Sequence, residues 1–129
     1  MPRELSTAAA AVGLHTVANV AHGVPHAEVP VALARWQTAF VYLVVLAAPV
    51  VALGLLWRGR FRAGATLLAA SMAASLAFGL FFHFVVPNPD HVDAVPTGPW
   101  RGPFRATAVL VALSDAVGVA VGVWLLADR

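Results

Sequence analysis

Four long apolar stretches constrain the fold of this chain more than any other feature of its sequence. They cover approximately residues 5–24, 36–57, 63–86 and 104–127. A helix of about 20 mostly apolar residues crosses a hydrocarbon core about 30 Å thick, and it satisfies its backbone hydrogen bonds internally. We therefore expect an all-α integral membrane protein, a four-helix bundle in which residues 1–129 form a single transmembrane domain.

The composition excludes several other classes of protein. The chain is 60% hydrophobic and 11% charged, whereas a soluble domain has roughly 45–50% apolar and about 25% charged residues. Eight basic residues, all arginine, lie mainly near helix ends and do not form a nucleic-acid patch. Without cysteine, disulfides and thiolate metal sites are excluded. We expect a multi-pass protein of a prokaryotic plasma membrane that contacts the lipid bilayer, binds no nucleic acid, and joins a homo-oligomer or a larger membrane complex.

Prolines and arginines separate the four stretches. Pro25 and Pro30 are expected to end the first helix and to precede the second, and Pro49 is expected to kink the second. Residues 58–62 form a short basic turn. Residues 87–103 contain five prolines, so they cannot be helical throughout and form a Pro-rich loop outside the hydrocarbon.

The arginines predict the orientation in the membrane. With both termini in the cytoplasm, five arginines lie on the inner side and three on the outer side, which agrees with the excess of positive charge found inside. The inner set is Arg3, Arg58, Arg60, Arg62 and Arg129, and the outer set is Arg35, Arg101 and Arg105. We expect an N-in/C-in topology with the Pro-rich loop between helices 3 and 4 at the outer face.

Three of the five histidines share one face of the first helix. His15, His22 and His26 are spaced by seven and four residues, which is close to whole helical turns, provided that the helix continues past Pro25. Asn19 lies on the same side. A polar stripe that faces lipid is costly, so we expect this stripe to face the interior of the bundle.

The outer ends of the helices bring histidines together from separate parts of the chain. His22 and His26 end the first helix, His83 ends the third, and Asp90 and His91 follow in the outer loop. Imidazole and carboxylate ligands together suit copper, zinc or iron. These five residues are the predicted metal ligands.

A haem b held by His22 and His83 is the second cofactor to consider. Gly23 and Gly79 lie next to these histidines or one turn away, and their missing side chains would leave space for a porphyrin. The leading hypothesis is thus a membrane protein that binds a transition metal or haem b at its outer face. It would serve electron transfer, metal handling or oxidation chemistry, and the sequence leaves open whether it is an enzyme.

A second polar group lies deeper in the membrane. An ionised Asp115 at mid-membrane would cost roughly 2.5–3.5 kcal/mol, so it must be protonated or paired. Its expected partners are His15, Asn19, Thr16 and Ser114. The functional interpretation is a proton relay or a pocket for a quinone head group, and the structural interpretation is a buried hydrogen bond that fixes helix register.

Two further hypotheses come from other classes of protein. A proton-coupled carrier or channel would use Asp115 and His15. A structural or accessory subunit without a cofactor is indicated by small residues that recur every four positions and allow close helix packing. These small residues are Ser71, Ser75 and Gly79 in the third stretch and Ser114, Gly118 and Gly122 in the fourth.

Overall fold

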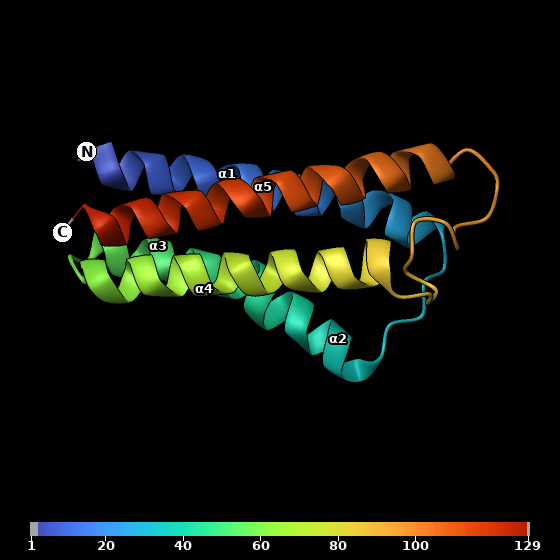
Figure 1. Ribbon diagram of the computed structural model, residues 1–129, viewed down its shortest axis with the longest axis horizontal. Helices are drawn as coiled ribbons and strands as arrows, with labels where there is room; N and C mark the ends of the chain where they lie inside the picture. The colour runs from blue at the N-terminus through green and yellow to red at the C-terminus, as the bar shows by residue number, and fades with distance from the viewer. Residues whose placement is uncertain (1–2, 129) are drawn as a thin grey trace.

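The computed structural model describes residues 3–128, which form an all-α bundle of four helices (Figure 1). Arg129, which entered the orientation argument, lies outside the described residues. The first and last helices are α1 (Arg3–Glu28) and α5 (Arg101–Ala127). The second consists of α2 (Arg35–Phe40), the π-helix η1 (Val41–Ala47) and α3 (Ala48–Trp57). The third consists of α4 (Phe61–Leu80) and the π-helix η2 (Phe81–Val85).

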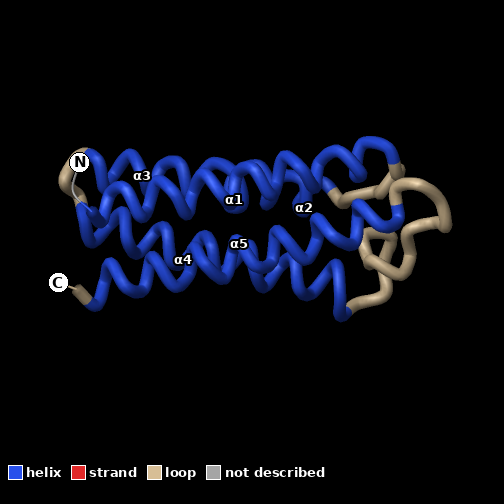
Figure 2. Tube along the Cα trace, turned by 90° about the horizontal axis from the view of Figure 1, so that it is seen from above, coloured by secondary structure: helices blue, strands red, loops and turns tan. Residues whose placement is uncertain are grey.

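The connections between helices gather mainly at one end of the bundle. Residues 29–34 and 86–100 lie there, and we call this the loop end (Figure 2). The short turn of residues 58–60 lies at the opposite end, where α1 begins and α5 ends (Figure 1). The loop end therefore brings together the end of α1, the end of η2 and the start of α5.

Three of the helices are long and apolar enough to cross a membrane. They are Arg35–Trp57, Phe61–Val85 and Arg101–Ala127. Helix α1 is as long, but it is not among the three, because the polar residues on its histidine stripe lower its hydropathy. Four spans were expected from the sequence, and three of them meet this criterion.

The expected end of the first helix at Pro25 is wrong. Helix α1 continues to Glu28, and the Val29 amide still donates to the Pro25 carbonyl at 2.8 Å. Pro25 itself is fully buried against the bundle, so packing outweighs the helical hydrogen bond that its missing N–H removes. The continued helix places His26 one turn beyond His22 on the same face.

The second proline inside a helix, Pro49, coincides with a widened turn. It lies two residues after the end of η1, and its missing N–H leaves the Val45 carbonyl four residues earlier without its helical donor. The ring of His15 in α1 takes that place, with Nε2 at 2.6 Å from the Val45 oxygen. The break in this helix thus creates a specific contact with α1.

At three glycines a neighbouring helix leaves no room for a side chain. A Cβ at Gly118 would lie 2.6 Å from Met72 Cγ, and a Cβ at Gly122 would lie 2.7 Å from the backbone nitrogen of Ala69. Gly64 meets Leu56 and Ala52 at similar distances. These glycines let α5 and α3 pack against α4 at a separation that no larger residue permits.

Replacing Gly122 by leucine should therefore destabilise the fold. The clash is with the backbone of α4, which cannot rotate away, and overpacking of this kind costs about 1–3 kcal/mol or more. Thermal unfolding of the purified protein in detergent measures the loss. Gly13→Leu is the matched control, because a Cβ at Gly13 meets nothing within 4 Å; equal melting temperatures for the two variants would contradict the packing described here.

Candidate metal centre

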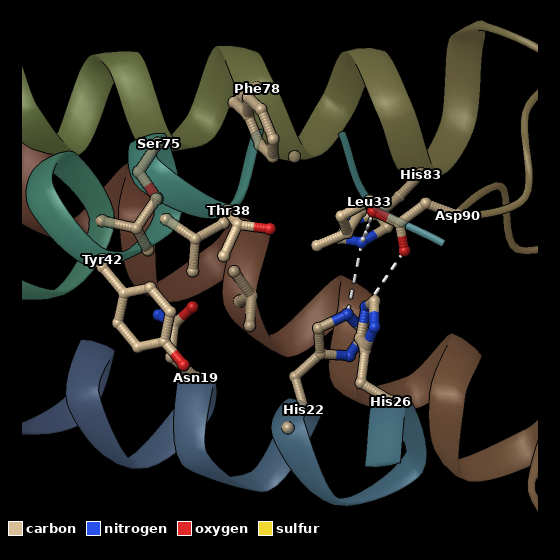
Figure 3. Close-up of a pocket in the computed structure, with 15 residues that line it drawn as sticks. Asn19, His22, His26, Leu33, Thr38, Tyr42, Ser75, Phe78, His83 and Asp90 are labelled. Carbon is tan, nitrogen blue, oxygen red and sulfur yellow. Dashed lines mark hydrogen bonds and ion pairs between the residues drawn. The ribbon is translucent and has the colours of Figure 1, made fainter. Parts of the chain in front are cut away.

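Four side chains from separate parts of the chain meet at the loop end. His22 and His26 come from α1, His83 comes from η2, and Asp90 comes from the loop that follows η2 (Figure 3). Ligand atoms of the three imidazoles all lie within 4.8 Å of one another. His22, His83 and Asp90 are buried and His26 is partly buried, so the described residues form a three-histidine group that could hold a metal ion.

Three distances in this group match the spacing of ligands around a single ion, while the imidazole ligand atoms as a set spread over up to 4.8 Å. His22 Nε2 lies 3.2 Å from His83 Nε2, His26 Nε2 lies 3.0 Å from Asp90 Oδ1, and His83 Nε2 lies 3.3 Å from Asp90 Oδ2. Tetrahedral zinc with bonds of about 2.0–2.1 Å places its ligand atoms about 3.3 Å apart. These three contacts therefore need little movement to become coordination bonds.

Asp90 has the charge and the position that a ligand requires. Burial raises the pKa of this carboxyl, but the imidazoles of His26 and His83 beside it outweigh burial and hold the pKa well below its usual range. Its two oxygens form ion pairs with these imidazoles, Oδ1 with His26 Nε2 at 3.0 Å and Oδ2 with His83 Nε2 at 3.3 Å. A cation held between the three groups would give the buried carboxylate a stronger partner than the imidazoles alone.

The loop that carries Asp90 is fixed to the helix that carries His83. Pro87 has no N–H, so it leaves the His83 carbonyl without its helical donor, and the Val92 amide donates to that carbonyl at 2.9 Å. Asn88 Oδ1 accepts a hydrogen bond from the Asp90 amide at 2.8 Å. The prolines that end this helix therefore also attach the loop, and the attachment holds Asp90 over the imidazoles.

Thr107 on α5 fixes the tautomer of His22. Its hydroxyl donates to the Pro103 carbonyl at 2.7 Å and lies 2.7 Å from His22 Nδ1. Because its single hydrogen is used, Thr107 Oγ1 accepts from His22 Nδ1–H. A neutral His22 then has its lone pair on Nε2, the atom that faces His83. Metal-binding histidines are commonly oriented in this way by a partner on the other ring nitrogen.

Sequence reasoning missed both Thr107 and its neighbour Phe104. The ring of Phe104 is fully buried, and its centroid lies 4.9–6.0 Å from the centroids of the three imidazoles, so it forms the apolar side of the site. Thr107 precedes Ser114 by seven residues, or two helical turns. Extending the small-residue stripe of this helix outward would have indicated it.

His91, which the sequence also placed among the ligands, does not join the group. Its Nδ1 accepts a hydrogen bond from the Asp93 amide at 3.1 Å within the loop. Arg105 in turn donates to Asp93 Oδ1 at 2.6 Å and to the Val92 carbonyl at 3.1 Å. These contacts make His91 part of the loop structure, and the three histidines that do converge come from helices.

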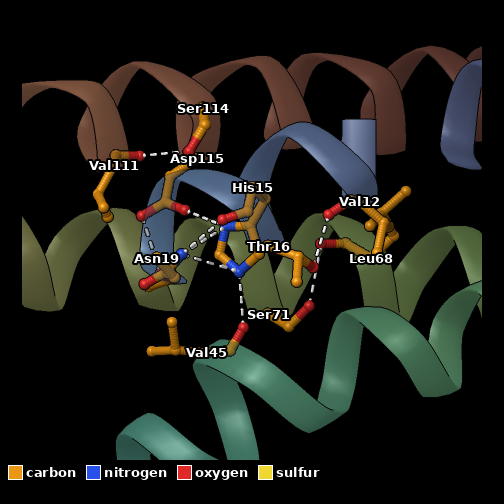
Figure 4. A network of polar contacts seen from close by, with 11 residues as sticks. Val12, His15, Thr16, Asn19, Val45, Leu68, Ser71, Val111, Ser114 and Asp115 are labelled. Atoms are coloured by element: carbon orange, nitrogen blue, oxygen red, sulfur yellow. Dashed lines mark hydrogen bonds and ion pairs between the residues drawn. The ribbon is translucent and has the colours of Figure 1, made fainter. Parts of the chain in front are cut away.

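The deeper polar group lies next to η1 and centres on His15 and Asp115 (Figure 4). His15 Nδ1 lies 2.6 Å from Asp115 Oδ1, and Nε2 lies 2.6 Å from the Val45 carbonyl. Ser75 on α4 donates to Asp115 Oδ2 at 2.8 Å. Both residues of the pair are fully buried, so one network connects the first, second, third and last helices.

The expected partners of Asp115 are distributed differently. Asn19 Nδ2 donates to the His15 carbonyl at 2.9 Å and lies beside the His15 ring. Thr16 and Ser114 each donate to a carbonyl of their own helix instead. The hydroxyl that does bind Asp115 is that of Ser75, which the sequence indicated only as a small packing residue.

Similarity to known proteins gives no indication of the function of this chain. The chain matches no family model, no curated protein and no solved structure. The chemistry of the two polar groups must therefore carry the functional conclusion.

Proposed function

We propose that this chain is a multi-pass membrane protein that binds one transition metal ion through His22, His26, His83 and Asp90. The observation that carries the proposal is the meeting of three imidazoles, with ligand atoms within 4.8 Å of one another, beside the buried carboxylate of Asp90. Three imidazoles and one carboxylate favour zinc or copper(II) over harder ions. The ion would connect α1, η2 and the following loop.

Haem b is less well supported by the same distances. Two axial nitrogens on opposite sides of an iron lie about 4 Å apart, twice a bond of about 2.0 Å, with the porphyrin between them. His22 Nε2 and His83 Nε2 are in direct contact at 3.2 Å, and Phe104 packs against both rings. A haem would have to separate the rings of His22 and His83 and displace Phe104, whereas a single ion requires neither change.

The proposed topology places the metal centre at the outer face of the plasma membrane. Helix α1 would be the fourth span, because its polar stripe faces the other helices and its large exposed residues, such as Val17 and Val20, are apolar. The basic turn of residues 58–62 would then lie in the cytoplasm at the opposite end from the metal centre. Both termini would lie on that side.

Titration of the purified protein with zinc or copper(II) against a competing chelator tests the proposal. We expect one ion per chain at saturation, and the same result for His91→Ala, because His91 is held in the loop by Asp93. The His91 variant is the control for non-specific imidazole binding. Failure to saturate with zinc, copper(II) and iron(II) alike would refute a metal centre.

The hydrogen bond from His22 to Thr107 should strengthen binding of the metal ion and leave the number of ions bound per chain unchanged. Thr107→Val keeps the size of the side chain and removes the acceptor, and loss of such a partner typically weakens metal binding about 10- to 100-fold. Competition with a chelator of known affinity measures the change. Thr16→Val is the matched control, because the Thr16 hydroxyl donates only to the Val12 carbonyl of its own helix; an equal loss in both variants would reject the assigned role.

A further inference from the structure

A cavity of about 280 Å³ lies directly beneath the proposed metal centre (Figure 3). Its outer end is formed by the imidazoles of His22, His26 and His83. Its inner end is lined by Asn19 and Ser75, which are hydrogen-bonded to His15 and Asp115 respectively. The space thus connects the two polar groups of the molecule, and most of its remaining wall is apolar.

Two glycines create part of this space. A Cβ at Gly23 would meet nothing within 4 Å, and a Cβ at Gly79 would meet only His83 Nδ1 at 3.7 Å. Both glycines line the cavity. They differ from Gly118 and Gly122, where a Cβ would clash with α4, so their role here is to leave room and not to bring helices together.

The cavity opens toward the side of the bundle. Three of its lining residues are exposed: Gly23 on α1, Thr38 on α2 and Tyr42 on η1, the last with 64% of its surface accessible. Figure 1 shows α2 turning away from the other helices near this position. Tyr42 lies within the apolar helix Arg35–Trp57, so in the proposed topology the opening would face the hydrocarbon and could be reached from the bilayer.

The polar groups at the inner end favour a ligand that donates hydrogen bonds. Asn19 and Ser75 present an amide oxygen and a hydroxyl oxygen, both of which are acceptors. The aromatic rings of Phe78 and Tyr42 line the space between the two ends, and aromatic rings pack well against a flat aromatic ligand. A saturated acyl chain would satisfy none of the polar groups, whereas a ring with a hydroxyl group at each end would bond to both ends of the cavity.

We infer that the cavity binds a membrane-soluble hydroquinone, with one hydroxyl toward the three histidines and the other toward Asn19 and Ser75. The inference rests on the proposed function, since the outer hydroxyl would face the bound metal ion. It also assigns a role to the deeper polar group, in which the His15–Asp115 pair orients Asn19 and Ser75 at the inner end. The proposal concerns binding, and it involves no change in the oxidation state of either partner.

Binding of decylhydroquinone to the full-length protein in lipid nanodiscs tests this inference. Zinc-loaded protein is used, because zinc has no redox chemistry with the ligand. We expect saturable binding of one hydroquinone per chain and at least tenfold weaker binding of its dimethyl ether, which has the same ring but cannot donate hydrogen bonds. Equal binding of the ether, or no saturable binding, would overturn the inference.

Two matched pairs of variants locate the ligand. Gly23→Val narrows the cavity and should weaken hydroquinone binding at least tenfold, whereas Gly13→Val, on the same helix and equally free of clashes, should leave it unchanged. Val41→Trp and Leu43→Trp form the second pair, because Val41 lines the cavity and Leu43 is 66% exposed and does not. Hydroquinone affinity that is unaffected by both cavity variants would also overturn the inference.

The zinc content of each sample separates this inference from the proposed function. One zinc per chain without hydroquinone binding would refute the hydroquinone site and leave the metal centre intact. Hydroquinone binding by protein that takes up neither zinc, copper(II) nor iron(II) would refute the metal centre, and with it the assignment of the outer hydroxyl to a metal ion.

Discussion

Replacing His83 by alanine is expected to weaken zinc binding about 100- to 1,000-fold. Structural zinc sites provide about 10–16 kcal/mol, so one of four ligands represents about 2.5–4 kcal/mol, which corresponds to that factor. His83 is the ligand whose loss should be felt most, because its Nε2 lies within 3.3 Å of both His22 Nε2 and Asp90 Oδ2. Isothermal titration or chelator competition measures the loss.

The control for His83→Ala is His91→Ala, which removes an imidazole from the same end of the bundle. His91 contacts only its own loop among the hydrogen bonds of the structure, so zinc affinity should remain within about twofold of wild type. A His83 variant that retains wild-type affinity, with its helical content unchanged by circular dichroism, would show that the three histidines do not form the binding site.

Replacing Asp115 by leucine is expected to produce the largest loss of stability. The substitution leaves His15 Nδ1 and the Ser75 hydroxyl without their acceptor in the fully buried centre of the bundle. Removing one partner of a buried pair costs about 3–5 kcal/mol. Thermal unfolding in detergent measures the effect, and at permissive temperature the zinc stoichiometry should remain at one, since the pair contacts none of the four proposed ligands.

A double-variant cycle determines whether the His15–Asp115 pair acts as a unit. His15→Leu alone leaves the Val45 carbonyl without its donor and leaves Asp115 Oδ1 without its partner, although Ser75 still donates to Oδ2; the two changes together remove both halves of the ion pair. We expect the double variant to be less destabilised than the sum of the single variants by about 0.5–3 kcal/mol. Strict additivity would mean that the 2.6 Å contact contributes nothing specific to the fold.

The helical architecture could be predicted because it depends on local properties of the chain. Long apolar stretches determine where helices can exist in lipid, and the breaks at residues 58–60 and 86–100 follow from arginine, glycine and proline. The end of α1 was predicted wrongly because the effect of Pro25 depends on tertiary packing. The ring is fully buried in the bundle, and burial of this kind cannot be deduced from the residues next to it in the sequence.

The candidate site was predictable only where helical periodicity determines it. The spacing of His22 and His26 places both on one face, and the direction of the third helix places His83 at the same end. The contribution of Thr107 depends on how α5 is rotated about its axis. Residue spacing could place Thr107 on the inward stripe of this helix but could not show that it binds His22. The position of His91 depends on hydrogen bonds inside an irregular loop, so it could not follow from residue spacing at all.

X-ray absorption spectroscopy of the zinc-loaded protein tests the central claim most directly. The account predicts four nitrogen and oxygen ligands at about 2.0–2.1 Å, with the outer-shell scattering of three imidazole rings. The His26→Ala variant should lose the scattering of one imidazole ring, which would show that His26, the residue after Pro25, is a ligand. A first shell of oxygen atoms without imidazole scattering would mean that zinc binds elsewhere, and it would contradict the account.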